Sequence, residues 1–328
     1  MNGFLSKKRE KDRIKIEYVF GKRIEIKFED GTIIWIYNNI EAHGKGLLTD
    51  LELNRDLYVK IRAKQRTLDN YRELKNKIQD FFNFFIDSDV LTESFKGLFR
   101  LENHGHNDMK EITVLYHSTI SKKMRKTEII RPFLFRNDEI SGLFVSLVQR
   151  WFKLREKENI VLDNYFGVMY NPGLFTENIL LMLAGALEAY LTDYRKKLSE
   201  SAQTRRERTR RIMPIVNELS ISEEDKNWIS GAISNRSFPS FEERIEEVYD
   251  DHREISAKFL HTKDKGTFGS KINRYRNGIS HANKNFQKES EELFRSTIDL
   301  QILVQLCVLS LLEFPYELVR KKFLNKKD

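Results

Sequence analysis

The segment RYRNGISHANKNF, residues 274–286, combines side chains that can bind and cleave a phosphodiester. Arg276 has a permanently charged guanidinium whose paired donors match a phosphate, and His281 exchanges protons near neutral pH. Cleavage needs an anchored phosphate, a proton acceptor for the attacking hydroxyl and a proton donor for the leaving oxygen. Arg276 and His281 are therefore candidates for these roles.

The spacing of these two residues is not distinctive, because Arg100 with His106 and Arg274 with His281 give similar pairs. The surroundings of Arg276 carry more information. It follows KGTFGSK, residues 265–271, which we interpret as a flexible connector into the next helix, and it precedes a long apolar helix. An ordinary helix start with an exposed histidine remains an alternative interpretation.

Helix geometry constrains any site built from this segment. Asn277 and His281 are four residues apart and share a helix face, whereas Arg276 lies roughly 140° from His281 around the axis. The long side chain of Arg276 must therefore reach around the helix, beside a groove such as one at a two-fold dimer interface.

Two kinds of pattern describe the elements that would position these residues. Alternation in RIEIKFE and TIIWIYN predicts an antiparallel meander, and helical spacing predicts a helix from about Asp56 to Phe85. After Pro172 only helical patterns follow, and Ser240 with Glu243 has the pattern of a helix start. The sequence predicts an α+β fold, with a mixed strand and helix domain over residues 1–155 and an all-α helical bundle over residues 172–328.

The charge distribution favours a polyanionic partner. The formal net charge is +8, and residues 195–211, RKKLSESAQTRRERTRR, hold eight basic side chains against two acidic ones. A solvated helix face or a loop between helices is the simplest interpretation of this segment.

Several classes of protein are disfavoured by composition. With Cys307 as the single cysteine, the chain forms no intramolecular disulfide and no cysteine-based zinc cluster. The amino terminus lacks the apolar core of a signal peptide, and the longest apolar runs are too short to span a bilayer. We expect a cytoplasmic protein without a membrane partner.

Phosphate-loop, dinucleotide and zinc-protease motifs are missing from the sequence. His104, His106 and Asp108 could supply two imidazoles and a carboxylate to a metal, but a polar loop is the simpler interpretation. We expect no metal and no cofactor.

The run YRNGISHAN resembles the R-N-x-x-x-H motif of the HEPN superfamily, helical bundles that act on nucleotides and RNA. The run GALEAYL, which contains Glu188, is similar to a helix of ApeA-like HEPN domains. The order of NKIQDFFNFFIDSD, further strands and a helix with Trp151 also looks like that subfamily.

This resemblance implies a metal-independent endoribonuclease of bacterial abortive anti-phage defence. Arg276 would bind the phosphate, His281 would act as general base or acid, and Asn277 would orient them, with Glu188 as a further site residue. The RNA 2′-hydroxyl would attack its own phosphodiester, leaving a cyclic phosphate and a 5′-hydroxyl. Two bundles would pair in a homodimer, and the N-terminal domain would sense a phage-derived trigger or restrain a latent nuclease.

RNA backbone contacts are expected from basic residues near the motif and in the basic segment: Arg205, Arg206, Arg208, Arg210, Arg211, Lys271 and Arg274. Tyr275 and Phe286 flank the motif and would either stack on bases or lie in the core. The alternative to a nuclease is a non-catalytic RNA-binding or protein-interaction module.

Overall fold

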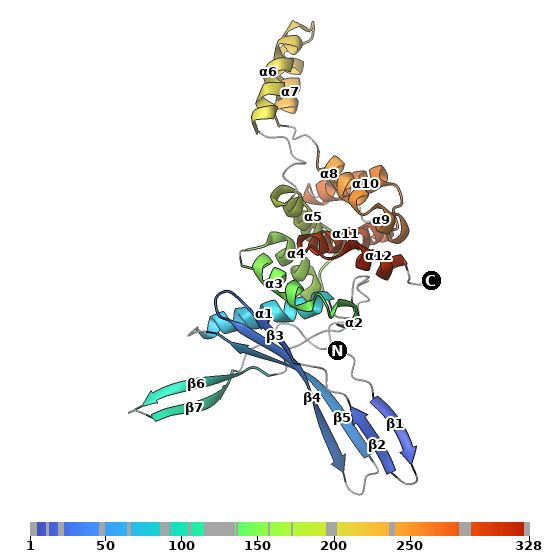
Figure 1. Cartoon of the computed structure of the whole chain (residues 1–328). Coiled ribbons are helices and arrows are strands. Elements are labelled where there is room, and N and C mark those ends of the chain that lie inside the picture. Colours follow the sequence, from blue (N-terminus) through green and yellow to red (C-terminus); the bar gives the residue numbers. More distant parts are fainter. Residues whose placement is uncertain are drawn as a thin grey trace. The chain divides into compact units, whose positions relative to one another are not determined.

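The described residues form two compact units, one up to Glu156 and one from Glu158 on (Figure 1). The structure is a computed structural model that describes residues 5–10, 13–18, 23–45, 50–63, 67–85, 92, 94–103, 106–114, 135, 137–156, 158–171, 173–194, 202–235, 240–281 and 290–324. The predicted α+β arrangement is confirmed, with small sheets and helices in the first unit and helices alone in the second.

Antiparallel strands make up the sheets of the first unit. Strands β3 (Ile24–Lys27), β4 (Ile33–Lys45) and β5 (Asp50–Arg62) form a meander in that order. A turn joins β3 to β4, in which Gly31 has a φ of 81°, a left-handed conformation that glycine adopts without steric cost. Two further hairpins consist of β1 (Leu5–Glu10) with β2 (Arg13–Tyr18), and β6 (Lys96–Asn103) with β7 (His106–Thr113).

Aromatic side chains join the helices of this unit to the meander. The helices are α1 (Leu68–Phe85), α2 (Asn137–Ile140) and α3 (Phe144–Leu154). On α3 the indole of Trp151 is buried and donates to the Lys77 carbonyl of α1 at 2.8 Å, while Phe152 packs on Phe28 at the end of β3. The helices therefore cover one face of the sheet.

The second unit is a helical bundle built around α11 (Figure 1). The bundle helices are α4 (Ile160–Tyr170), α5 (Thr176–Asp193), α8 (Phe241–Asp251), α9 (Arg253–Phe259), α10 (Lys265–Ser280), α11 (Ser290–Leu311) and α12 (Tyr316–Leu324). Two further helices, α6 (Ala202–Glu218) and α7 (Glu223–Asn235), pack on each other. By length and composition α11 could cross a membrane, but 78% of that stretch is buried inside the unit. Core packing thus accounts for its apolar sequence.

Two predicted elements are wrong. The helix expected from about Asp56 begins at Leu68, because residues up to Arg62 continue strand β5 and pair with β4. The segment KGTFGSK is not a connector but the first turns of α10. Its second glycine serves packing, since a Cβ at Gly269 would lie 3.0 Å from the Glu242 carbonyl oxygen of α8.

Candidate functional site

Arg276 and Glu188 form an ion pair between α10 and α5. The Nη2 of Arg276 donates to the Oε2 of Glu188 at 2.6 Å, although the two residues are 88 positions apart in the chain. Both side chains are partly exposed, at 31% and 39%. The side chain of Arg276 makes no other hydrogen bond to a described residue, so the rest of its guanidinium is available to an anion.

A third helix supports the guanidinium of Arg276 from one side. Its Cζ lies 4.8 Å from the ring centre of Phe241, a cation–π contact with the first residue of α8. A capping box fixes this helix start, since Ser240 Oγ accepts from the Glu243 amide at 3.2 Å and the Glu243 carboxylate accepts from the Ser240 amide at 2.6 Å. The helix start predicted at Ser240 is confirmed.

Buried residues on the adjoining part of α10 hold Arg276 at the edge of the bundle. Phe268, Ile272 and Tyr275 are all fully buried. Tyr275 is therefore a core residue and not a surface for stacking bases. Phe286 lies outside the described residues.

His281 lies at the carboxyl end of α10. Its backbone amide donates to the Asn277 carbonyl at 3.0 Å, and its side chain is exposed. The Asn277 amide group donates to Asn273 Oδ1 at 3.2 Å, and its role in orienting the imidazole stays a prediction. Within the described part of the chain, no hydrogen bond joins the His281 ring to Arg276 or Glu188.

Family models match both parts of the chain. One for Apea-like HEPN covers residues 181–318, a range that contains Glu188, Phe241, Arg276 and His281. One for ApeA N-terminal domain 1 covers residues 1–151. The chain joins an ApeA N-terminal domain to an ApeA-like HEPN domain. No curated protein and no solved structure gives a significant match.

Lys271 and Arg274 of the HEPN domain are already engaged with neighbouring side chains. Lys271 Nζ lies 2.6 Å from Glu292 Oε1, and the guanidinium of Arg274 stacks 4.9 Å from the ring centre of Tyr275. This Lys271 hydrogen bond is the main reason why the pKa of Glu292 lies below its ordinary value. An RNA contact through Lys271 would have to displace a carboxylate.

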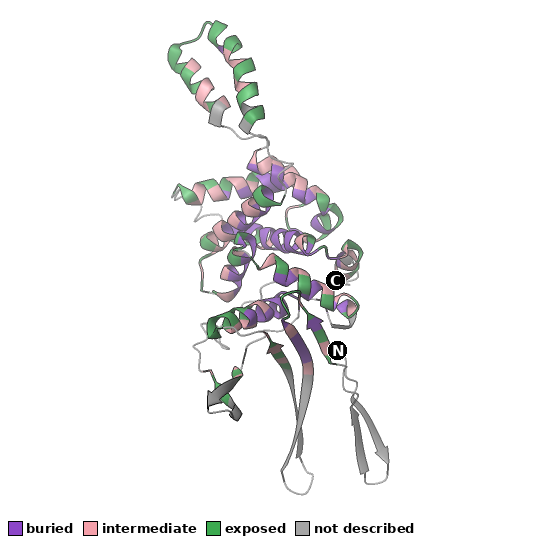
Figure 2. Cartoon of the chain, turned by 60° about the vertical axis from the view of Figure 1, so that its left-hand side comes forward, coloured by how far each residue is buried: buried purple, intermediate pink, exposed green. Residues whose placement is uncertain are grey.

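The five arginines predicted to contact RNA from the basic segment lie on α6, which packs on α7 within the HEPN domain and is mostly exposed (Figure 2). Arg206, Arg210 and Arg211 are exposed, Arg208 is half-buried, and for Arg205 only the helical backbone is described. The structure does not bring these residues into contact with Arg276, and their contact with RNA stays a prediction.

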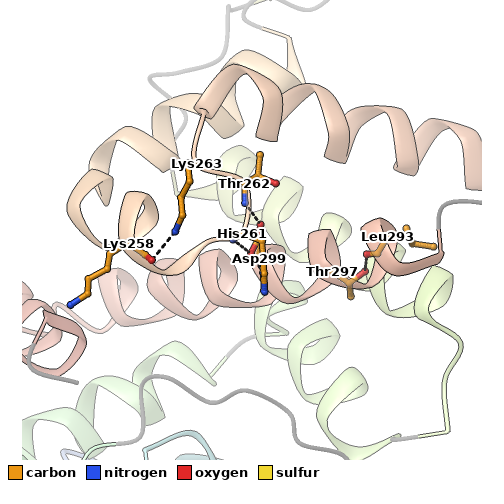
Figure 3. A network of polar contacts seen from close by, with 7 residues as sticks. All are labelled: Lys258, His261, Thr262, Lys263, Leu293, Thr297 and Asp299. Carbon is orange, nitrogen blue, oxygen red and sulfur yellow. Dashed lines mark hydrogen bonds and ion pairs between the residues drawn. The ribbon is translucent and has the colours of Figure 1, made fainter. Parts of the chain in front are cut away.

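The sequence reasoning missed a polar network that fixes the start of α10 (Figure 3). The fully buried Asp299 of α11 accepts from the backbone amides of His261 and Thr262 at 2.7 and 2.9 Å, and from His261 Nδ1 at 2.8 Å. This carboxylate ties the loop before α10 to the core of the HEPN domain.

The metal ligands considered from the sequence do not form a described site. His104 lies outside the described residues, and His106 and Asp108 are on β7. Among the described residues, no group of three or more His, Cys, Asp or Glu is placed to hold a metal ion.

Proposed function

We propose that the HEPN domain, which belongs to a family that often contains ribonucleases, is a metal-independent endoribonuclease. His281 caps the carboxyl end of α10, the helix of Arg276. The observation that carries this proposal is the ion pair between Arg276 and Glu188, with the Arg276 guanidinium against Phe241 of α8. It presents a partly exposed guanidinium, oriented from two sides, as a phosphate site.

In the proposed reaction Arg276 binds the scissile phosphate. The RNA 2′-hydroxyl loses its proton to a base, its oxygen forms a new bond to phosphorus, and the bond from phosphorus to the 5′-oxygen breaks. The leaving 5′-oxygen takes up a proton, so that the products are a 2′,3′-cyclic phosphate and a 5′-hydroxyl. His281 serves as the base or the acid, with Asn277 beside it on the helix.

Glu188 is a positioning residue in this proposal, because it contacts Arg276 and not the RNA. Its carboxylate holds one edge of the guanidinium and leaves the remaining donors for the phosphate. A homodimer that pairs two HEPN domains would bring a second His281 to the RNA, so that one imidazole serves as base and the other as acid.

The family match supports a biological setting that we also propose. The protein would act in the cytoplasm of a bacterium during abortive anti-phage defence. The ApeA N-terminal domain would keep the nuclease latent until it senses a phage-derived trigger.

A non-catalytic RNA-binding or protein-interaction domain is the second candidate. It is favoured by the lack of a described hydrogen bond between the His281 ring and the pair of Arg276 with Glu188. Such a domain would bind RNA through the same surface and release no cyclic phosphate.

The test is cleavage of purified total RNA in EDTA by the wild type and by His281→Ala and Arg276→Ala. We expect a cyclic-phosphate product from the wild type and a loss of about 100-fold or more in each variant. Arg295→Ala is the matched control, since Arg295 is an exposed arginine of the same domain, paired with Glu291. Equal cleavage by all four proteins would exclude the proposed site.

A latent nuclease would be silent in that assay. Growth arrest of expressing bacteria during phage infection, which would supply the trigger, then replaces cleavage as the readout. Growth arrest that disappears with His281→Ala supports a nuclease, whereas arrest that persists does not.

A further inference from the structure

Where the structure describes its side chains, the face of the β3–β5 sheet that points away from α1 and α3 is both basic and aromatic. The alternation of each strand separates it from the buried face of Ile26, Ile34 and Ile36. The residues of this outer face pair across the strands as Glu25 with Trp35 and Lys60, Lys27 with Ile33 and Arg62, and Tyr37 with Tyr58. We propose that it binds single-stranded nucleic acid.

Trp35 forms the centre of this face, and its neighbours hold it in place. Its indole Nε1 donates to Glu25 Oε2 at 2.6 Å, and the guanidinium of Arg23 lies 4.7 Å from its ring centre. Lys60 approaches the same ring at 5.8 Å. The indole itself is only 7% exposed. A ligand would therefore contact the flat guanidinium of Arg23, which lies over the indole, and not the indole ring. Such a guanidinium plane can stack on a nucleobase.

A second stacking surface lies one step along the strands. The rings of Tyr37 and Tyr58 are stacked, with centres 5.8 Å apart and planes within 14° of parallel. Tyr58 is 39% exposed, so this cross-strand pair offers a ring of fixed orientation to a base. Bases of any sequence can stack in this way.

The cations around these rings are placed to contact phosphates. Lys27, Lys60 and Arg62 are exposed, and neither Lys60 nor Arg62 forms an ion pair with a described residue. Among the residues of this face whose side chains the structure describes, the one carboxylate is that of Glu25, which already accepts from Trp35 and lies 3.1 Å from Lys27. Basic side chains that alternate with aromatic rings suit a flexible strand whose bases are unpaired, and a duplex would hide those bases.

The test measures binding by fluorescence anisotropy in the full chain. The background protein carries His281→Ala, which prevents cleavage, and Arg206→Ala, Arg210→Ala and Arg211→Ala, which remove the exposed arginines of α6. The probes are labelled oligouridylate, oligodeoxythymidylate, a DNA duplex of equal length and poly-glutamate. The two single strands distinguish an RNA ligand from a DNA ligand.

Tyr58→Ala should weaken single-strand binding about fivefold or more, while Tyr58→Phe, which keeps the ring, should stay within about twofold. Lys60→Ala with Arg62→Ala should lower the slope of log affinity against log salt by about 0.7 for each lost phosphate contact. Arg72→Ala with Lys153→Ala, which changes two exposed cations on α1 and α3, should leave both affinity and slope unchanged.

Three results would overturn the proposal. They are no binding of either single strand by the background protein, affinities that do not respond to Tyr58→Ala, and equal affinity for the duplex. Binding of poly-glutamate that is sensitive to Lys60 and Arg62 but not to Tyr58 would instead indicate an acidic protein partner. Since His281 is absent from the assay, failure of this proposal is separate from failure of the proposed nuclease.

Discussion

Two carboxylates of the HEPN domain bind nitrogen donors in opposite ways. Asp299 is fully buried and accepts three hydrogen bonds, two of them from backbone amides. Glu188 is 39% exposed and binds one guanidinium, that of Arg276. Both carboxylate oxygens of Asp299 thus accept hydrogen bonds from described residues, whereas only Oε2 of Glu188 does.

Solvation explains why this difference separates structure from function. A carboxylate without water must have its lone pairs satisfied by protein donors, and losing it leaves those donors buried and unpaired. A half-exposed ion pair exchanges with water at little cost and contributes little to folding. We therefore expect Asp299 to matter for stability and Glu188 to matter for chemistry.

The largest expected effect is that of Asp299→Ala. Removing this carboxylate leaves the backbone amides of His261 and Thr262 without a hydrogen-bond acceptor. We therefore expect the free energy of unfolding, measured by urea denaturation, to fall by about 3–5 kcal/mol. Glu291→Ala, an exposed acid on the same helix, should change it by less than about 0.5 kcal/mol. A loss below about 1 kcal/mol for Asp299→Ala would mean that the network does not anchor the loop.

Glu188→Gln should affect RNA cleavage more than it affects stability. Its unfolding free energy should change by less than about 1 kcal/mol, because the ion pair with Arg276 is partly exposed. RNA cleavage should fall about 10-fold to 100-fold in kcat, because the guanidinium is no longer held in one orientation. Glu188→Asp should recover part of that loss. If Glu188→Gln lowered the melting temperature in proportion to the loss of cleavage activity, Glu188 would have a structural role instead.

The smallest expected effect concerns Glu292, whose pKa lies below its ordinary value of 4.5 chiefly because of the hydrogen bond from Lys271. A carboxyl with a lowered folded pKa stabilises the protein fully above its unfolded pKa, and the contribution disappears as pH falls through the folded pKa. Thermal melts should therefore show the wild type losing Tm below about pH 4.5 slightly more steeply than Glu292→Gln. Parallel curves for the two proteins would contradict the pairing.

Much of the fold was predictable because it depends on local patterns. Alternation identified strands β3 and β4 of the meander but not β5, the Ser240 and Glu243 spacing identified a helix start, and long apolar runs identified buried helices. The error after Asp56 arose because strand β5 ends only a few residues before helix α1 begins. A stretch of sequence that spans both elements mixes the two-residue period of a strand with the 3.6-residue period of a helix.

The site was less predictable because it depends on tertiary packing. The sequence placed Glu188 among the candidates only by family resemblance, and nothing local to it indicates a contact with Arg276 from 88 residues away. The role of Phe241 was missed, because an aromatic residue after a helix cap is also an ordinary core residue. KGTFGSK was misread because glycine permits close helix packing as well as loops, and only the neighbouring α8 distinguishes the two.

The buried carboxylate of Asp299 also affects the local opening of the domain, which hydrogen exchange measures. The amides of His261 and Thr262 belong to a loop, yet their acceptor lies on the central helix α11. Their protons can exchange with solvent only when that helix is uncovered, so the loop should share the slow hydrogen exchange of the core. The start of α10, and with it the helix that carries Arg276 and His281, would then open only together with the core.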